Sequence, residues 1–323
     1  MRLSRLGLLF LIAASVLLGS SCGYYSRIMS RKDLVDGSMA YRERKFAEAE
    51  NLFRKAAGRD PQGTTVEGKT AQVFLARTLH SRFIGNRQDT SIAEEAIKEY
   101  QKALVQNPND QSSYKAVASL YENLQKPDDW QKWVTERSAN TGIDAQYRAE
   151  ALTALASKQN TCSNEISDTE ATKKTVKGAD GKEVYQFIKP ADAAQFDKMK
   201  ACVAKGQELI EQAVAVEPDS VKNAKTANLK SLTDEQLKQL LDSVKIFESA
   251  RSYRASIAIQ ASRLAEMEGR NADRDKIKAD ADNYKNAYTD LSEVNRNIQT
   301  EIDARRAAAE AAANANANAN AKK

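Results

Sequence analysis

The sequence predicts an all-α protein: a row of short helix pairs, then a long C-terminal helix and a disordered tail. Three observations lead to this. The 323 residues include only 5 prolines and 13 glycines, which suits helices joined by short connections. Small and aromatic residues recur at helical spacing from Gly37 to Pro61, and the pattern returns further along the chain. Near the C-terminus, apolar residues repeat every seven positions.

Composition limits the classes of function. Lys and Arg number 49 against 44 Asp and Glu, for a formal net charge of +5. The charges are interspersed along the chain, whereas a nucleic-acid-binding protein usually carries a clustered basic face. We therefore expect no nucleic-acid partner. The sequence indicates no cofactor.

The N-terminus reads as a targeting segment, residues 1–21. Arg2 and Arg5 precede an apolar run from Leu6 to Leu18 that is short for a membrane span. Small residues then lead to Cys22, and this arrangement resembles a bacterial lipoprotein signal, in which that cysteine becomes the lipidated first residue. Gly23 follows, where the family's inner-membrane retention signal has Asp. The resemblance implies a lipid anchor at the periplasmic face of the outer membrane. Ordinary secretory cleavage after Ser21 is the alternative.

A tether, residues 22–31, leads into the first helix pair of a repeat region over residues 32–219. Ala49 and Gly37 let the two backbones approach, Phe46 and Phe53 fill the gap, and Pro61 stops the second helix. A pair this small cannot bury its own apolar face, so it implies neighbours of the same kind.

Those neighbours follow in order. The second copy repeats the four packing positions of the first at Ala96, Tyr100, Ala103 and Pro108. It is longer than the first copy, and its additional residues, near 80–92, are expected at the turn between its two helices. A third, looser copy carries Ala118 and Tyr121. Its Trp130 and Trp133 are interpreted as core or interface side chains, with ligand stacking as the alternative.

A fourth unit begins at Gln146 and resumes around Ala194, after an insertion over residues 160–192. Glycines at 178 and 181, flanked by valines, indicate a small β-hairpin in it. Cys162 would lie just past the first helix of this unit and Cys202 near the start of its second helix. In an exported protein such a pair can oxidise, and we expect a disulfide that closes the insertion rather than a redox site.

The C-terminal region, residues 231–303, changes pattern. Thr233 and Gln236 resemble a capping box at the start of one helix. A second helix from Asn271 to Ile302 carries the heptad repeat, with apolar residues at Ile277, Tyr284, Leu291 and Ile298. It is interpreted as a closing helix that packs back on the protein, with an intermolecular coiled coil as the alternative. The alanine-rich and asparagine-rich tail, residues 304–323, is expected to be disordered.

The first three units resemble the tetratricopeptide repeat, a helix–turn–helix of about 34 residues. Gly37, Ala49, Phe53, Ala56 and Pro61 occupy the family's packing positions, as do Ala71, Phe74, Ala96, Tyr100, Ala103 and Pro108. The resemblance implies a right-handed superhelix of helical repeats. Its inner groove, lined by the first helix of each pair, would bind a peptide or another protein. By repeat position, its side chains would be Ser38, Tyr41, Arg42, Gln72, Leu75, Ser119, Glu122 and Asn123.

The sequence gives no positive sign of catalysis. It lacks a phosphate-binding glycine loop and the zinc-protease and serine-hydrolase motifs, and its one histidine, His80, has no evident partner. We therefore expect no enzyme and no metal, but a protein-binding scaffold anchored in the bacterial cell envelope through Cys22. The alternative is a structural protein that self-associates into a homo-oligomer through the helix at 271–302. A third possibility is an accessory subunit that uses the insertion at 160–192 as its contact.

Overall fold

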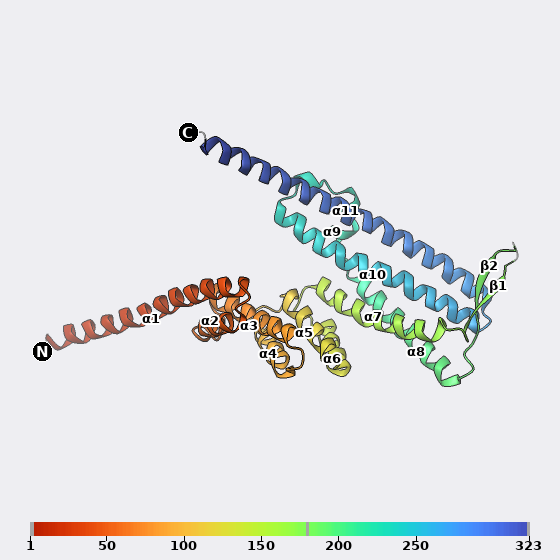
Figure 1. Ribbon diagram of the computed structural model, residues 1–323, viewed down its shortest axis with the longest axis horizontal. Helices are drawn as coiled ribbons and strands as arrows, with labels where there is room; N and C mark the ends of the chain where they lie inside the picture. The colour runs from red at the N-terminus through yellow and green to blue at the C-terminus, as the bar shows by residue number, and fades with distance from the viewer. Residues whose placement is uncertain (1–2, 179–180, 322–323) are drawn as a thin grey trace. The chain divides into compact units, whose positions relative to one another are not determined.

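The computed structural model describes the backbone of residues 3–178 and 181–321, and the side chains of residues 23–178 and 181–315. Figure 1 shows an all-α protein with one small hairpin, which confirms the predicted class. The chain divides into two compact units, residues 1–133 and 134–323, and the division falls within α6. Each unit is described by itself.

The first unit consists of consecutive helices, each packed on the next as far as α5. Their bounds are α1 Leu3–Arg42, α2 Phe46–Gly58, α3 Val66–Gly85, α4 Thr90–Gln106, α5 Gln111–Asn123 and α6 Pro127–Ala139. α1 thus runs without a break through the expected tether into the first helix pair. The side chain of Cys22 lies outside the described residues, so its lipidation stays a prediction.

The core of the first unit lies between these helices. It is built from the predicted small and aromatic positions, including Ala49, Phe53, Ala96 and Tyr100. Gly37 is required for the close approach of α1 and α2, since a Cβ atom there would lie 2.8 Å from the Phe53 ring. Trp133 stacks on Tyr114 with ring centroids 5.8 Å apart, which confirms its interpretation as a packing residue.

The connections of the first unit are defined by polar caps. The Thr65 hydroxyl accepts a hydrogen bond from the Gly68 amide at 3.0 Å and so caps α3. Thr65 is itself held by Asp60, whose carboxylate accepts bonds from the backbone and hydroxyl groups of Thr64 and Thr65. Burial alone would raise the pKa of Asp60, but these hydrogen bonds outweigh it and lower that pKa to about 2.

The second unit is a helical assembly with a hairpin at one end (Figure 1). After α6 come α7 Ala145–Ser167, β1 Lys173–Lys177, β2 Glu183–Phe187, α8 Ala193–Ala215 and α9 Asp219–Lys222. Two short 3-10 turns follow, η1 Ala224–Thr226 and η2 Leu229–Ser231, and then α10 Asp234–Met267 and α11 Asn271–Ala321. α10 packs on α7, α8 and α11.

Several predictions for the second unit are confirmed. The strands pair antiparallel, with Thr175 opposite Tyr185. A disulfide joins Cys162 on α7 to Cys202 on α8, with their Cα atoms 6.2 Å apart. Cys162 lies inside a helix rather than just past one, because α7 continues into the expected insertion as far as Ser167. Cys202 lies in the N-terminal half of α8, which begins at Ala193. Thr233 and Gln236 form the capping box at the start of α10.

α11 packs along α10 of the same chain, as the closing-helix interpretation predicts. Leu291 and Ile298 from the predicted heptad positions are buried, and so is Val294 between them. α11 extends through Ala321, into the tail that the sequence predicts to be disordered. The side chains of residues 316–323 fall outside the described residues. Judged by length and hydropathy, none of the helices in the described part of the chain is a candidate membrane span.

Candidate functional site

The candidate site of the first unit depends on the length of α3. The surplus residues near 80–92 were expected at a turn, but the structure continues α3 through Gly85, and α4 begins at Thr90. Phe83 explains the difference, because its buried side chain joins the core and continues the apolar face of the helix. The added helical turns carry His80, Ser81 and Ile84, and these side chains form one wall of a pocket.

We call this the arginine–aromatic pocket. Its volume is about 690 Å³, and it lies between the C-terminal end of α1, the start of α2, α3 and α4. The lining contains three arginines and several aromatic rings, but no carboxylate: Tyr41, Arg42, Arg44, Phe46, Arg77, His80, Ser81, Ile84, Gly85 and Tyr100. The site is therefore cationic, with apolar surface beside the charges.

The aromatic part of the pocket is held in place by packing. Tyr41 meets the ring of Phe46 edge-on at 5.4 Å and that of Phe74 at 6.4 Å. Its hydroxyl shares a hydrogen bond of 2.9 Å with Ser81 on α3. Arg77 lies over the Phe74 ring at 5.5 Å. Such contacts restrict the side chains before any ligand arrives, which lowers the entropy lost on binding.

The pair of His80 and Tyr100 forms the deeper part of the lining. The His80 Nδ1 atom lies 3.4 Å from the Tyr100 hydroxyl, and the rings meet edge-on at 6.0 Å. Burial lowers the pKa of His80 and raises the pKa of Tyr100, because it disfavours the charged form of each. Both side chains are thus neutral near pH 7, and the arginines supply the positive charge of the pocket.

Arg44 has an unusual backbone for an arginine, with a φ angle of 62°. It ends α1 in a Schellman arrangement, in which the Arg44 amide donates to the Tyr41 carbonyl and the Lys45 amide to the Ala40 carbonyl. Glycine is favoured at this position because a side chain there costs about 1–2 kcal/mol. A strained residue at a pocket is a reason to suspect function.

The structure brings only part of the predicted groove together. Tyr41 and Arg42 line the pocket. Gln72 and Leu75 are wrongly placed by the repeat register, because both are buried. The Gln72 side-chain amide donates to the Glu99 carboxylate at 2.6 Å, and Leu75 belongs to the core. The inward face of α3 includes these positions, so they hold helices together.

The remaining predicted groove residues lie elsewhere in the first unit. Ser38 on α1 donates its hydroxyl hydrogen bond to the Leu34 carbonyl at 2.7 Å. Ser119, Glu122 and Asn123 are exposed on α5, and the Asn123 amide donates to the Ser119 carbonyl at 2.8 Å. None of these four lines the pocket as the structure describes it.

Sequence reasoning missed Arg44, Arg77, Ser81 and Ile84. Three of them were available from helical spacing, because Arg77, Ser81 and Ile84 are four and three residues apart and share one face of a helix that reaches Gly85. Treating residues 80–92 as a turn concealed that face. Arg44 had no comparable signal, since the left-handed conformation gives no reason to expect an arginine.

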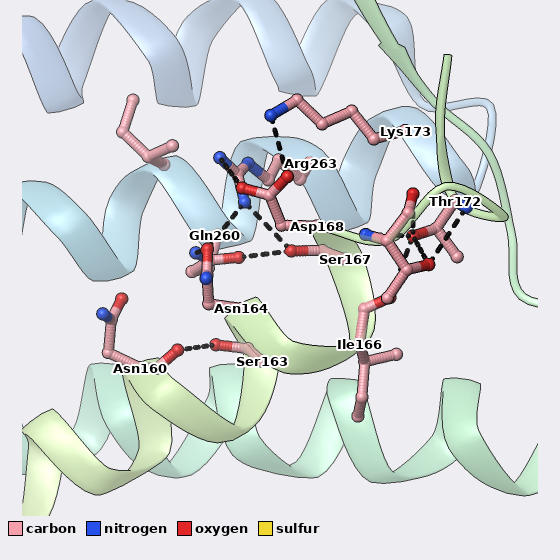
Figure 2. A network of polar contacts seen from close by, with 12 residues as sticks. Asn160, Ser163, Asn164, Ile166, Ser167, Asp168, Thr172, Lys173, Gln260 and Arg263 are labelled. Carbon is pink, nitrogen blue, oxygen red and sulfur yellow. Dashed lines mark hydrogen bonds and ion pairs between the residues drawn. The ribbon is translucent and has the colours of Figure 1, made fainter.

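A second cluster of polar side chains lies at the base of the hairpin in the second unit. Figure 2 shows Asn164 and Ser167 of α7, and Asp168 just after its end, facing Gln260 and Arg263 of α10. Ser167 donates to Gln260 at 2.9 Å, and Gln260 donates to Asn164 at 3.0 Å. Arg263 donates to both Asn164 and Ser167 at 3.0 Å. Ser167 and Gln260 are buried, and these hydrogen bonds pair their side chains with the partly exposed Asn164 and Arg263.

The same cluster holds the start of the hairpin. Lys173 of β1 forms an ion pair of 2.8 Å with Asp168, and Thr172 donates to the Ile166 carbonyl at 3.0 Å (Figure 2). Arg263 also lies 4.5 Å from the centre of the Phe187 ring on β2. These contacts fix the hairpin base to α7 and α10, while Val184 and Tyr185 of β2 stay exposed. We assign the cluster a structural role.

The arginine–aromatic pocket is therefore the better candidate for binding. It offers guanidinium groups for anionic oxygens and an apolar wall for a side chain, and its lining contains no carboxylate that would repel an acidic ligand. The sequence matches no protein-family model, and no curated protein is similar to it. The tetratricopeptide assignment therefore stays a prediction.

Proposed function

We propose that the protein is a membrane-anchored scaffold of the bacterial cell envelope that binds acidic segments of other proteins in the arginine–aromatic pocket. The observation that carries this proposal is the lining itself: three arginines and no carboxylate beside an aromatic wall. Arginine is well suited to such a ligand, because its planar guanidinium can donate two parallel hydrogen bonds to one carboxylate. Binding would hold a partner near the membrane without turnover.

The pocket also limits the form of the ligand. A volume of about 690 Å³ accommodates a few side chains rather than a folded surface. Ile84 is 46% exposed at its edge, and the edges of Tyr41 and Phe46 offer apolar contact. A short extended or helical segment with Asp or Glu next to one apolar residue fits this arrangement. Repeat folds of the predicted kind usually bind a peptide or another protein.

The envelope location comes from the sequence. The segment 1–21 and Cys22 together resemble a lipoprotein signal, and Gly23 favours the outer membrane. If Cys22 is the anchor, the lipid would tether α1 directly, because the structure gives one continuous helix from Leu3 to Arg42. Metabolic labelling with a radioactive fatty acid tests this part, since a Cys22→Ala variant should lose the label.

Selection from a library of displayed random peptides tests the ligand class. We expect enrichment of peptides that combine Asp or Glu with an apolar residue. The affinity of a selected peptide should fall at least about tenfold in Arg77→Glu, because the charge reversal replaces attraction with repulsion. Arg87→Glu, outside the pocket lining, is the control. Enrichment without acidic bias, or equal loss in both variants, would contradict the proposal.

The hairpin supports the third possibility, an accessory subunit that uses the insertion at 160–192 as its contact. Tyr185 is 61% exposed and Val184 45% exposed, on a hairpin whose base is fixed by the polar cluster. Exposed apolar side chains on a fixed strand suit a second protein contact. By contrast, self-association through α11 would need side chains other than Leu291 and Ile298, which α10 covers.

A further inference from the structure

One face of α1 carries large apolar side chains that the protein leaves exposed. We call this face the α1 stripe, and define it as Tyr24, Ile28, Val35 and Met39. Their exposed fractions are 70%, 48%, 51% and 44%, and neighbouring Tyr25 is 65% exposed. Residues at these intervals share one side of a helix, because 3.6 residues complete a turn.

The opposite side of the same helix already makes the contacts that fold the first unit. Ser30, Asp33 and Ala40 are buried there. Ser30 donates to the Ala56 carbonyl at 3.1 Å, and Asp33 pairs with Arg59. These buried positions lie about half a turn from the α1 stripe. Packing against α2 and α3 therefore explains one side of α1 and leaves the α1 stripe without a partner among the described residues.

The charges around the α1 stripe favour an anionic partner. Arg31 and Lys32 are exposed beside it, and no described residue forms a salt bridge with either. Arg27 is also largely exposed, although it pairs with Glu67 at 3.1 Å. Of the acidic residues on this part of α1, Asp33 faces away into the protein and Asp36, next to Val35, is partly buried. Apolar side chains alternate with cations along this face, and the tyrosines lie at its N-terminal end.

We propose that the α1 stripe lies on the surface of an anionic phospholipid bilayer, parallel to the membrane plane. A helix in this position places aliphatic side chains at the boundary of the acyl chains and cations among the headgroups. Tyrosine is favoured at the same depth because its ring is apolar and its hydroxyl polar. The helix would then be a second membrane contact, in addition to the anchor predicted at Cys22.

Photo-crosslinking of the full chain in its native envelope tests this proposal. A benzophenone amino acid replaces Ile28 or Val35 in separate variants, and the mass of the adduct identifies the neighbour. Val66 is the matched control: it is a 73% exposed valine in the first turn of α3, next to the Glu67 that pairs with Arg27. It therefore shares the region of the α1 stripe without belonging to it.

We expect phospholipid adducts at positions 28 and 35, and at most a small fraction of that yield at position 66. Adding Arg31→Glu and Lys32→Glu should lower the lipid adduct at position 35 at least about tenfold, because the attraction to anionic headgroups becomes repulsion. A protein adduct at positions 28 and 35 would overturn the proposal in favour of a protein partner. Equal lipid adducts at all three positions, or none, would also overturn it.

Discussion

Arg44 is the residue whose conformation most directly connects structure and proposed function. Its φ angle of 62° puts an arginine where glycine would be less strained, and its side chain lines the arginine–aromatic pocket. Gln125 has the same conformation, with a φ angle of 54°, and ends α5 by the same pair of backbone hydrogen bonds. Gln125 does not line the pocket, so the two residues form a natural comparison.

Arg44→Gly and Gln125→Gly should each stabilise the protein, by about 1 kcal/mol, because glycine adopts the left-handed conformation without strain. Only Arg44→Gly should weaken the binding of an acidic peptide, because it removes one cation of the pocket. Chemical denaturation and peptide titration measure the two effects. If both variants bind the peptide as the wild type does, Arg44 has no part in recognition.

Asp60 predicts a specific dependence of stability on pH. Its pKa is lowered to about 2 in the folded protein, against an ordinary value of 3.8, so the folded state binds the proton more weakly than the unfolded state. The contribution of this carboxylate to stability is therefore complete above pH 4, and it is lost as pH falls toward 2.

The unfolding free energy of Asp60→Asn should consequently fall less between pH 4 and pH 2 than that of the wild type. Thermal denaturation across that range measures the difference. The exposed carboxylate of Glu48 on α2 provides the control, because Glu48→Gln leaves the capped turn before α3 unchanged. An acid dependence that is the same in Asp60→Asn and in the wild type would show that the Asp60–Thr65 hydrogen bonds do not persist in solution.

At the scale of elements, the sequence was most informative where a local pattern had one physical meaning. The glycines at 178 and 181 indicated the hairpin because a tight turn needs a residue such as Gly181, whose φ angle is 77°. The heptad pattern indicated a long helix, but could not say whether its apolar face would meet this chain or another. In the structure, Leu291 and Ile298 are buried where α11 packs on α10, so the apolar face meets this chain.

α3 shows why the rest could not be predicted. A repeat of about 34 residues fixes the expected length of each helix pair. The residues near 80–92 exceed that length, and the repeat pattern therefore places them in a turn. Phe83 instead continues the apolar face formed by Leu75, Ala76 and Leu79, and burying it favours a longer helix. The same pattern put Gln72 and Leu75 in the groove, although spacing alone places them on the buried face. One wall of the pocket, with His80, Ser81 and Ile84, thus lies in the misassigned segment.

The disulfide between α7 and α8 predicts an effect on the stability of these elements. It closes a loop with a sequence separation of 40, which corresponds to about 4 kcal/mol in the chain-entropy relation. Replacing both Cys162 and Cys202 by Ser should therefore lower the unfolding free energy of the second unit by up to that amount. Urea denaturation followed with and without reductant measures it.

Reduction provides the control for that experiment, because it should bring the wild type to the stability of the double variant and leave the variant unchanged. A wild type that is insensitive to reductant would mean that the bond does not form or does not constrain the unfolded chain.

In the whole molecule, the two units carry different features. The first unit carries the arginine–aromatic pocket and the α1 stripe, and the second unit carries the disulfide and the hairpin. Each unit has its own buried core. The central claim is that the first unit binds another protein through the arginine–aromatic pocket while its first helix contacts lipid.

Photo-crosslinking in the native envelope, from a benzophenone amino acid in place of Ile84, distinguishes these contacts, because Ile84 is an exposed residue of the pocket lining. We expect a protein adduct there that is lost in Arg77→Glu and retained in Arg87→Glu. A phospholipid adduct, no adduct, or a protein adduct that persists in Arg77→Glu would contradict it.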